Sequence, residues 1–120
     1  MTTYKSVSIN RIYLDPANPR HDPINNEREI IAHLLKTEDI RPLAKSISTL
    51  GSTSPIELLA LAPHPTAKNR FNTAEGNRRI CALKLLADPD KASTEKDRKY
   101  FRGLQNGLAK PINSVMSVIF

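Results

Sequence analysis

The sequence has a single cysteine, Cys81, and this scarcity excludes two kinds of stabilising site. One thiol cannot form an internal disulfide, and it cannot supply the thiolates of a multi-cysteine zinc site. Aromatic residues make up only 5% of the chain, too few for a platform on which the bases of a single strand stack. There is also no apolar run long enough to cross a membrane and no signal-like start. We therefore expect a cytoplasmic protein with no membrane partner, in which Cys81 is a small core residue.

Positive charge is what the sequence has in excess. Its 120 residues include 18 Lys and Arg against 12 Asp and Glu, which gives a net charge of +6. Such a protein attracts polyanions at moderate salt, although many basic domains bind no nucleic acid. Hydrophobic residues make up 39% of the chain, enough for one modest core, so we expect a single domain over residues 1–120. Positive charge combined with few aromatic residues indicates that a ligand would be recognised through its phosphates more than through its bases.

The first half of the chain shows the patterns of one strand and two helices. Residues 7–12 alternate apolar and polar side chains, as a half-buried strand does. Apolar residues at one-turn spacing over residues 30–35 predict a helix that starts after Asn26. A second helix is predicted from the N-cap Asp39 to the C-cap Gly51.

The second half adds three strands and two helices. Strands are predicted over residues 55–61, 70–74 and 115–120. One helix begins at Gly76, and another is capped by Thr94 and Asp97 and extends to Leu108. The fold class is therefore α+β, a small mixed β-sheet flanked by about four helices. Because an apolar strand is an unusual natural C-terminus, we expect this domain to be the N-terminal part of a longer protein.

The junction of strand and helix at Gly76 carries most of the chemistry. The first N–H groups of a helix lack acceptors within the helix, and the helix dipole is positive there, so an anion is stabilised. Gly76 lets the backbone approach closely, and Arg78 and Arg79 can add forked hydrogen bonds to phosphate oxygens. Glu75 would lie beside this pocket as a base or as the partner of an arginine. The alternative interpretation is that Gly76 only makes the turn and that both arginines are solvated.

Four motifs in order resemble the ParB/sulfiredoxin superfamily, along nearly the whole chain. They are Asn-Pro-Arg at residues 18–20, Leu-Ala-Lys-Ser-Ile at 43–47 with Gly51, Pro-Ile at 55–56 and Gly-Asn-Arg-Arg at 76–79. The ParB pattern has an Asn-Pro-Arg turn, a helix of the form Leu-Ala-x-Ser-Ile-x-x-x-Gly, a Pro-Ile strand and a Gly-Glu-Arg-Arg turn. The resemblance implies a ParB/sulfiredoxin-like fold and a nucleotide pocket.

The resemblance also assigns residues to that pocket. It implies that Gly76, Asn77, Arg78 and Arg79 hold the triphosphate of a nucleotide, CTP or ATP, with or without Mg²⁺. By the same resemblance, Gly51, Ser54 and Pro55 shape the pocket. Arg20 could reach the same anion or could pin its own loop, and the sequence leaves both roles open.

Asn77 departs from the family pattern in a way that limits the chemistry. ParB proteins usually carry a glutamate there that is associated with nucleotide turnover, and an amide cannot act as a general base. Sulfiredoxins carry their nucleophilic cysteine at this position, so Asn77 excludes sulfinic-acid reduction by that route. Hydrolysis in the ParB manner would need Glu75 as a substitute. Acidic residues near the turn are scarce, so we expect no metal site formed by the protein alone.

Three functions follow from these residues. The first is a nucleotide-binding ParB-like domain of a DNA-associated protein, whether partition-like, mobile-element or regulatory, with DNA and a second copy of the chain as further partners. The second is a phosphoryl-transfer enzyme, an NTPase or nuclease, that uses Glu75. The third is a catalytically dead domain that docks DNA or protein. Basic residues of the last helix form either a solvated face or a DNA-backbone contact; they are Lys96, Arg98, Lys99 and Arg102.

Overall fold

The computed structural model describes residues 3–14, 26–51 and 59–120. Its strands are β1 (Thr3–Ser8), β2 (Ile12–Tyr13), β3 (Leu59–Pro63), β4 (Phe71–Glu75) and β5 (Ser114–Ile119). Its α-helices are α1 (Glu27–Thr37), α2 (Ile40–Leu50), α3 (Asn77–Ala87) and α4 (Glu95–Asn106). Two short 3-10 helices, η1 (Ile9–Arg11) and η2 (Pro89–Lys91), complete the described elements. The α+β fold class with four helices is confirmed.

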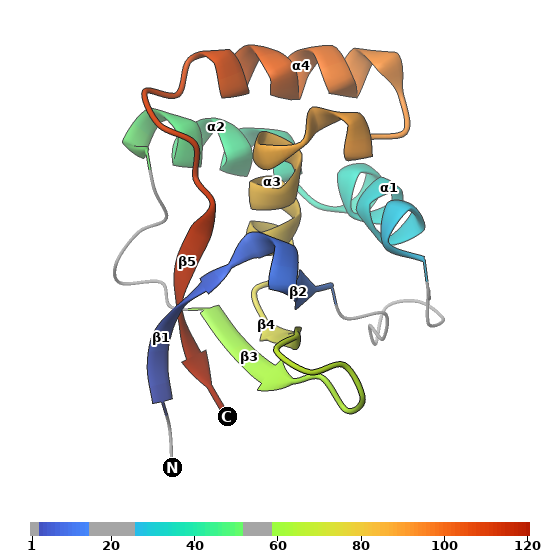
Figure 1. Ribbon diagram of the computed structural model, residues 1–120. Coiled ribbons are helices and arrows are strands. Elements are labelled where there is room, and N and C mark those ends of the chain that lie inside the picture. Colours follow the sequence, from blue (N-terminus) through green and yellow to red (C-terminus); the bar gives the residue numbers. More distant parts are fainter. Residues whose placement is uncertain (1–2, 15–25, 52–58) are drawn as a thin grey trace.

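The five strands form one mixed sheet in the order β1-β5-β3-β4-β2. The pairs β1–β5 and β3–β4 are antiparallel, whereas β3–β5 and β2–β4 are parallel. In Figure 1 the sheet occupies the lower part of the molecule and the helices gather above it, with both chain ends at the lower edge. The sheet order places β4, and the start of α3 that follows it, next to β2 and β3.

Helix α3 is the centre of the core. Every residue from 80 to 86 is buried, and the helix packs against α1, α2 and α4. A helix that is buried all round has neighbours on every face, so it is held rigidly at its position. Its N-terminal turn emerges from this core toward solvent, because Arg78 is exposed and Asn77 and Arg79 are half-buried.

Three of the predicted helix caps form as the sequence signals indicate, and one does not. Asn26 accepts hydrogen bonds from the N–H groups of Arg28 (2.9 Å) and Glu29 (3.3 Å), and Gly51 ends α2 in the left-handed conformation (φ 77°). Thr94 caps α4 by accepting from the N–H of Asp97 at 3.2 Å. The N-cap prediction for Asp39 is wrong in its mechanism: α2 starts after it, but its side chain makes no capping hydrogen bond.

Boundaries differ from the predictions in the first and last parts of the chain: β1 begins at Thr3, four residues before residue 7, and β5 covers Ser114–Ile119 instead of residues 115–120. The strand predicted over residues 7–12 is broken by η1, which begins at the buried Ile9. The N–H of Ile9 still donates to the carbonyl of Asn113 at 2.9 Å, one position beyond the last β1–β5 pair, Ser8 and Ser114. The predicted last helix ends at Asn106 instead of including Leu108, and Gly107 closes it.

The strands around the Gly76 turn are shifted relative to the predictions. β3 begins at Leu59 and continues to Pro63, past the predicted end at residue 61. Residues 55–58 of that prediction lie outside the described residues. β4 runs from Phe71 to Glu75, one residue later than predicted. The longest helix in the described ranges has 12 residues, and none there is long and apolar enough to cross a membrane.

Candidate functional site

Gly76 joins β4 to α3 in a conformation that other residues rarely adopt. Its φ is 108°, and a Cβ at this position would collide with Cδ2 of Leu59, which is buried in β3. Both the backbone angle and the packing therefore require glycine. The close approach of β3 and α3 positions the first turn of α3 at the end of the sheet.

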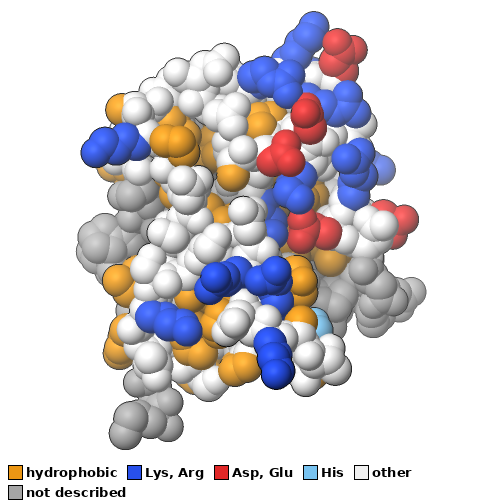
Figure 2. Space-filling model, viewed as in Figure 1, with side chains coloured by type: hydrophobic (Ala, Val, Ile, Leu, Met, Phe, Trp, Pro, Cys, Tyr) orange, Lys and Arg blue, Asp and Glu red, His pale blue; other side chains and the backbone are white. Residues whose placement is uncertain are grey.

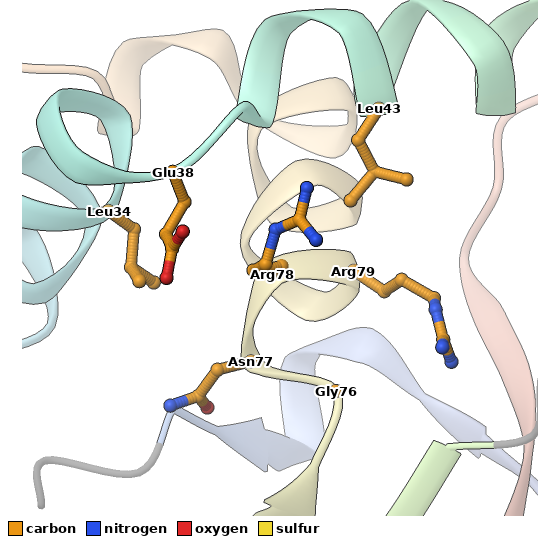
Figure 3. A pocket seen from close by; sticks show the side chains of 7 residues that line it. All are labelled: Leu34, Glu38, Leu43, Gly76, Asn77, Arg78 and Arg79. Atoms are coloured by element: carbon orange, nitrogen blue, oxygen red, sulfur yellow. The ribbon is translucent and has the colours of Figure 1, made fainter. Parts of the chain in front are cut away.

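A pocket of about 340 Å³ opens at this turn. The described residues that line it come from the ends of three helices, and they are Leu34, Glu38, Leu43, Gly76, Asn77, Arg78 and Arg79. Figure 3 shows Leu34 and Leu43 forming apolar walls on either side of the polar groups. The pocket thus brings together all four residues of the Gly-Asn-Arg-Arg motif.

Arg78 is the cation best placed to bind an anion in this pocket. In Figure 3 its guanidinium extends from α3 toward the space between α1 and α2. The side chain is exposed and forms no ion pair or hydrogen bond with any residue in the described ranges. Five donor N–H groups in a fixed fork are therefore available to an oxyanion.

Asn77 and Arg79 point to opposite sides of the first turn. Figure 3 shows the Asn77 amide on the side of Glu38, whereas Arg79 extends away from Glu38 toward the sheet. Both are half-buried pocket residues that already take part in an interaction. An anion that contacts Arg78 and the helix N-terminus would therefore meet the Asn77 amide before the Arg79 guanidinium.

The backbone of this turn adds a positive field. The first intrahelical hydrogen bond runs from the N–H of Ile80 to the carbonyl of Gly76 at 2.9 Å. The N–H groups of residues 77–79 consequently have no acceptor within the helix. They form the positive end of the α3 dipole, which stabilises negative charge by a few tenths to about 1 kcal/mol at a surface site.

Glu38 is a functional candidate that sequence reasoning missed. It is the residue that ends α1, where its N–H bonds the carbonyl of Leu34 at 2.8 Å, and it is half-buried in the pocket. It is the only acidic side chain among the described residues that line this pocket. No motif in the sequence links Glu38 to Gly76, since only the packing of α1 beside α3 brings them together.

The other predicted pocket residues are placed differently. Glu75 is exposed at the end of β4 and is not among the described residues that line the pocket. Gly51 ends α2 and is likewise not among them. Arg20, Ser54 and Pro55 lie outside the described residues. The structure therefore brings together Gly76, Asn77, Arg78 and Arg79 and adds Glu38.

The basic residues of α4 are mostly engaged by neighbouring groups. Arg98 donates to the carbonyls of Ala92 (2.9 Å) and Ser93 (3.1 Å), and Arg102 pairs with Asp90 at 2.6 Å. Lys99 pairs loosely with Glu95 at 3.7 Å, and Lys96 is exposed. These contacts direct the side chains of Arg98, Lys99 and Arg102 toward neighbouring groups of the protein instead of toward a ligand.

Two buried groups in α3 have perturbed ionisation. Burial raises the pKa of Cys81 to about 12, so its thiol stays protonated and unreactive, consistent with a core residue. Burial also lowers the pKa of Lys84, against the opposing attraction of Glu27, whose Oε2 lies 3.3 Å from the Lys84 ammonium. Lys91 contacts the other oxygen of Glu27 at 3.1 Å, so this network ties α1, α3 and η2 together.

The described residues offer no ready-made metal site. Among them no three His, Cys, Asp or Glu side chains cluster in a way that could hold an ion. A cation at the pocket would therefore need ligands from a bound anion as well as from Glu38. Mg²⁺ is commonly held in this way, by one or two carboxylates and by substrate phosphates.

Comparisons with family models, with curated proteins and with solved structures found no match to this chain. The resemblance to the ParB/sulfiredoxin superfamily therefore rests on the four ordered motifs alone. Of these motifs, the described residues include residues 43–47 with Gly51, which form α2 and its cap, and residues 76–79, which line the pocket.

Proposed function

We propose that the pocket at the start of α3 binds the phosphate groups of a nucleoside triphosphate such as CTP or ATP. The observation that carries the proposal is the Arg78 guanidinium, which lacks an acceptor among the described residues and belongs to the pocket at which α3 begins. An oxyanion there would gain charge-assisted hydrogen bonds and the field of the helix dipole together. The ParB-like motifs further suggest that the domain belongs to a DNA-associated protein, with a ParB/sulfiredoxin-like fold.

The size of the pocket supports a small ligand. A volume of about 340 Å³ is at the lower end of the range of roughly 300–1,000 Å³ that is usual for small-molecule sites. Leu43 is half-buried and offers apolar surface next to the charged groups, whereas Leu34 is only 3% exposed. This surface suits a ligand with both phosphates and a less polar part. Inorganic phosphate alone would leave those apolar walls without a contact.

Binding is better supported than turnover by the residues at the turn. Asn77 occupies the position beside the phosphates, and its amide cannot accept a proton from water. Glu75 is exposed and does not line the pocket, so it is poorly placed to act as a base.

Phosphoryl transfer is the second candidate, and Glu38 is the observation that favours it. Its carboxylate lines the same pocket as Arg78 and could share a divalent cation with bound phosphates. Under this alternative, Glu38→Gln abolishes turnover and the dependence of binding on Mg²⁺. Under the binding proposal, Glu38→Gln strengthens nucleotide binding without Mg²⁺, because it removes a negative charge beside the phosphates.

Calorimetric titration with CTP, ATP, GTP and inorganic phosphate, with and without Mg²⁺, tests the proposal. Arg78→Ala should weaken binding of the preferred nucleotide about 10- to 100-fold, since a hydrogen bond to a charged group contributes roughly 1.5–3 kcal/mol. Lys96→Ala removes the same charge from α4 and serves as the matched control, with less than a twofold effect expected. Equal losses in the two variants, or an undiminished affinity in Arg78→Ala, would rule out this pocket.

A further inference from the structure

A second group of basic residues lies around the start of β4, and we call it the sheet patch. Its members are Lys5, Arg11, Lys68 and Arg70. Arg11 and Arg70 immediately precede Ile12 and Phe71, which are paired in the parallel ladder of β2 and β4. The Lys5 ammonium lies 5.0 Å from the centroid of the Phe71 ring, and Lys68 is two residues before Arg70 in the turn that leads into β4. Three separate segments of the chain thus bring positive charge to one place.

The sheet patch differs from the surface of α4 in lacking acidic neighbours. Within the described part of the chain, Arg11, Lys68 and Arg70 form no ion pair, and Lys5 contacts only the aromatic ring of Phe71. Figure 2 shows Lys and Arg side chains without Asp or Glu over the lower, sheet-bearing part of the visible face. The upper part of the same face mixes both signs. Positive charge at the sheet patch is therefore not neutralised by the protein.

The sheet patch is separate from the pocket at Gly76. Arg70 precedes the first residue of β4, and Gly76 follows its last residue, so the two lie at opposite ends of the strand. A strand of five residues is roughly 17 Å long. The phosphates of a nucleotide held at Gly76 would therefore lie about a strand's length from the sheet patch, so they would not neutralise it.

We infer that the sheet patch binds the phosphate backbone of duplex nucleic acid. Several unneutralised Lys and Arg on one surface match a ligand that presents phosphates at regular intervals and releases counterions on binding. Tyr4 is 63% exposed, but it neighbours Lys5 along β1, so its side chain lies on the opposite face of the sheet. Beside the patch, Tyr13 is 36% exposed and His64 is half-buried. Their rings meet edge to face at 5.3 Å, so they offer no open platform on which bases could stack. These features favour a duplex over a single strand.

This inference rests on the proposed association with DNA, but it does not depend on nucleotide binding at Gly76. It moves the predicted DNA contact from α4, where Arg98 and Arg102 are held by neighbouring groups, to the sheet. The two sites can fail independently, because variants of the sheet patch leave every pocket residue in place. Variants at Arg78 likewise leave the sheet patch unchanged.

Fluorescence anisotropy with a labelled 20-base-pair duplex, at several salt concentrations, tests the inference. The test variant combines Arg11→Gln, Lys68→Gln and Arg70→Gln. The matched control combines Lys96→Gln, Lys99→Gln and Arg102→Gln, which removes the same charge from α4. A single strand of the same length is titrated in parallel. Thermal melting followed by circular dichroism confirms that each variant folds, and the pair Arg11→Gln and Lys68→Gln, both at exposed positions, replaces the triple variant if it does not fold.

The sheet-patch variant should bind the duplex at least tenfold more weakly than the wild type at low salt. Its plot of log affinity against log salt should be shallower by about 2–3, because each lost phosphate contact removes about 0.9 from the slope. The α4 variant should lose less than threefold, and nucleotide affinity should be unchanged in the sheet-patch variant. Equal losses of duplex affinity in the sheet-patch and α4 variants would show that only the net charge of the protein matters, and this would overturn the inference. Tighter binding of the single strand, or no duplex binding by the wild type, would also overturn it.

Discussion

The first turn of α3 and the surface of α4 are both rich in positive charge, yet their cations lie in different surroundings. On α4, Arg98 is held by two backbone carbonyls and Arg102 by Asp90. At the start of α3, the Arg78 side chain has no partner among the described residues and lies at a helix N-terminus. The two regions therefore differ in whether their hydrogen-bond donors are available to a ligand, and not in the number of cations.

This comparison shows why net charge alone locates no site. The excess of six positive charges is spread over the sequence, and α4 holds one of its denser basic runs. A cation that is already paired gains little from a new anion, because binding would first break an existing contact. An anion that meets an unpaired cation near a helix N-terminus gains both a contact and a favourable field.

The largest effect is expected from Gly76, which shapes the turn at α3. Gly76→Ala places a side chain at φ 108° and against Cδ2 of Leu59, so the free energy of unfolding should fall by about 2–4 kcal/mol. Nucleotide binding should be lost with it, because the first turn of α3 must move. Urea unfolding and calorimetric titration measure the two effects.

Gly51→Ala is the matched control for this prediction. Gly51 also has a positive φ, 77°, but nothing lies within 4 Å of an added Cβ, so only backbone strain of roughly 1–2 kcal/mol is expected. Combining Gly76→Ala with Leu59→Ala should cost less than the sum of the single changes, because the collision is relieved. Additive costs in that double variant would show that packing against Leu59 does not constrain the turn.

A smaller effect should distinguish two cations within α4. Arg98→Ala removes hydrogen bonds to two backbone carbonyls and should lower the free energy of unfolding by about 1–2 kcal/mol. Lys99→Ala should change it by less than about 0.5 kcal/mol, because its pair with Glu95 is long and the Lys99 side chain is 76% exposed. Thermal and chemical unfolding provide both values. Similar losses in the free energy of unfolding for Arg98→Ala and Lys99→Ala would mean that the contacts of these two cations do not determine what each contributes to stability.

Local sequence signals predicted most of the helical structure. Asn26 and Thr94 cap their helices, and Gly51 and Gly76 adopt the left-handed conformations for which glycine is selected. These features depend on neighbours within a few residues along the chain, so the local sequence is sufficient to predict them. The Gly-Asn-Arg-Arg turn was visible for the same reason, and the structure places all four of its residues at one pocket.

Features that depend on long-range packing were not predictable from the sequence. The break in the predicted first strand at Ile9 occurs where the pairing of β1 with β5 ends, and β5 is more than a hundred residues away along the chain. The buried ion pair of Lys84 with Glu27 and the presence of Glu38 in the pocket both depend on how α1 packs on α3. Glu75 was predicted to lie at the site because it adjoins Gly76 in sequence, whereas the strand end leaves it exposed.

The most direct test of the central claim is an NMR titration of the ¹⁵N-labelled domain with the preferred nucleoside triphosphate. The account predicts saturable shifts that are largest for the amides of Gly76, Asn77, Arg78 and Arg79, and small shifts along α4. Shifts that are largest along α4, or the absence of any saturable shift, would contradict the assignment of the nucleotide site to the start of α3.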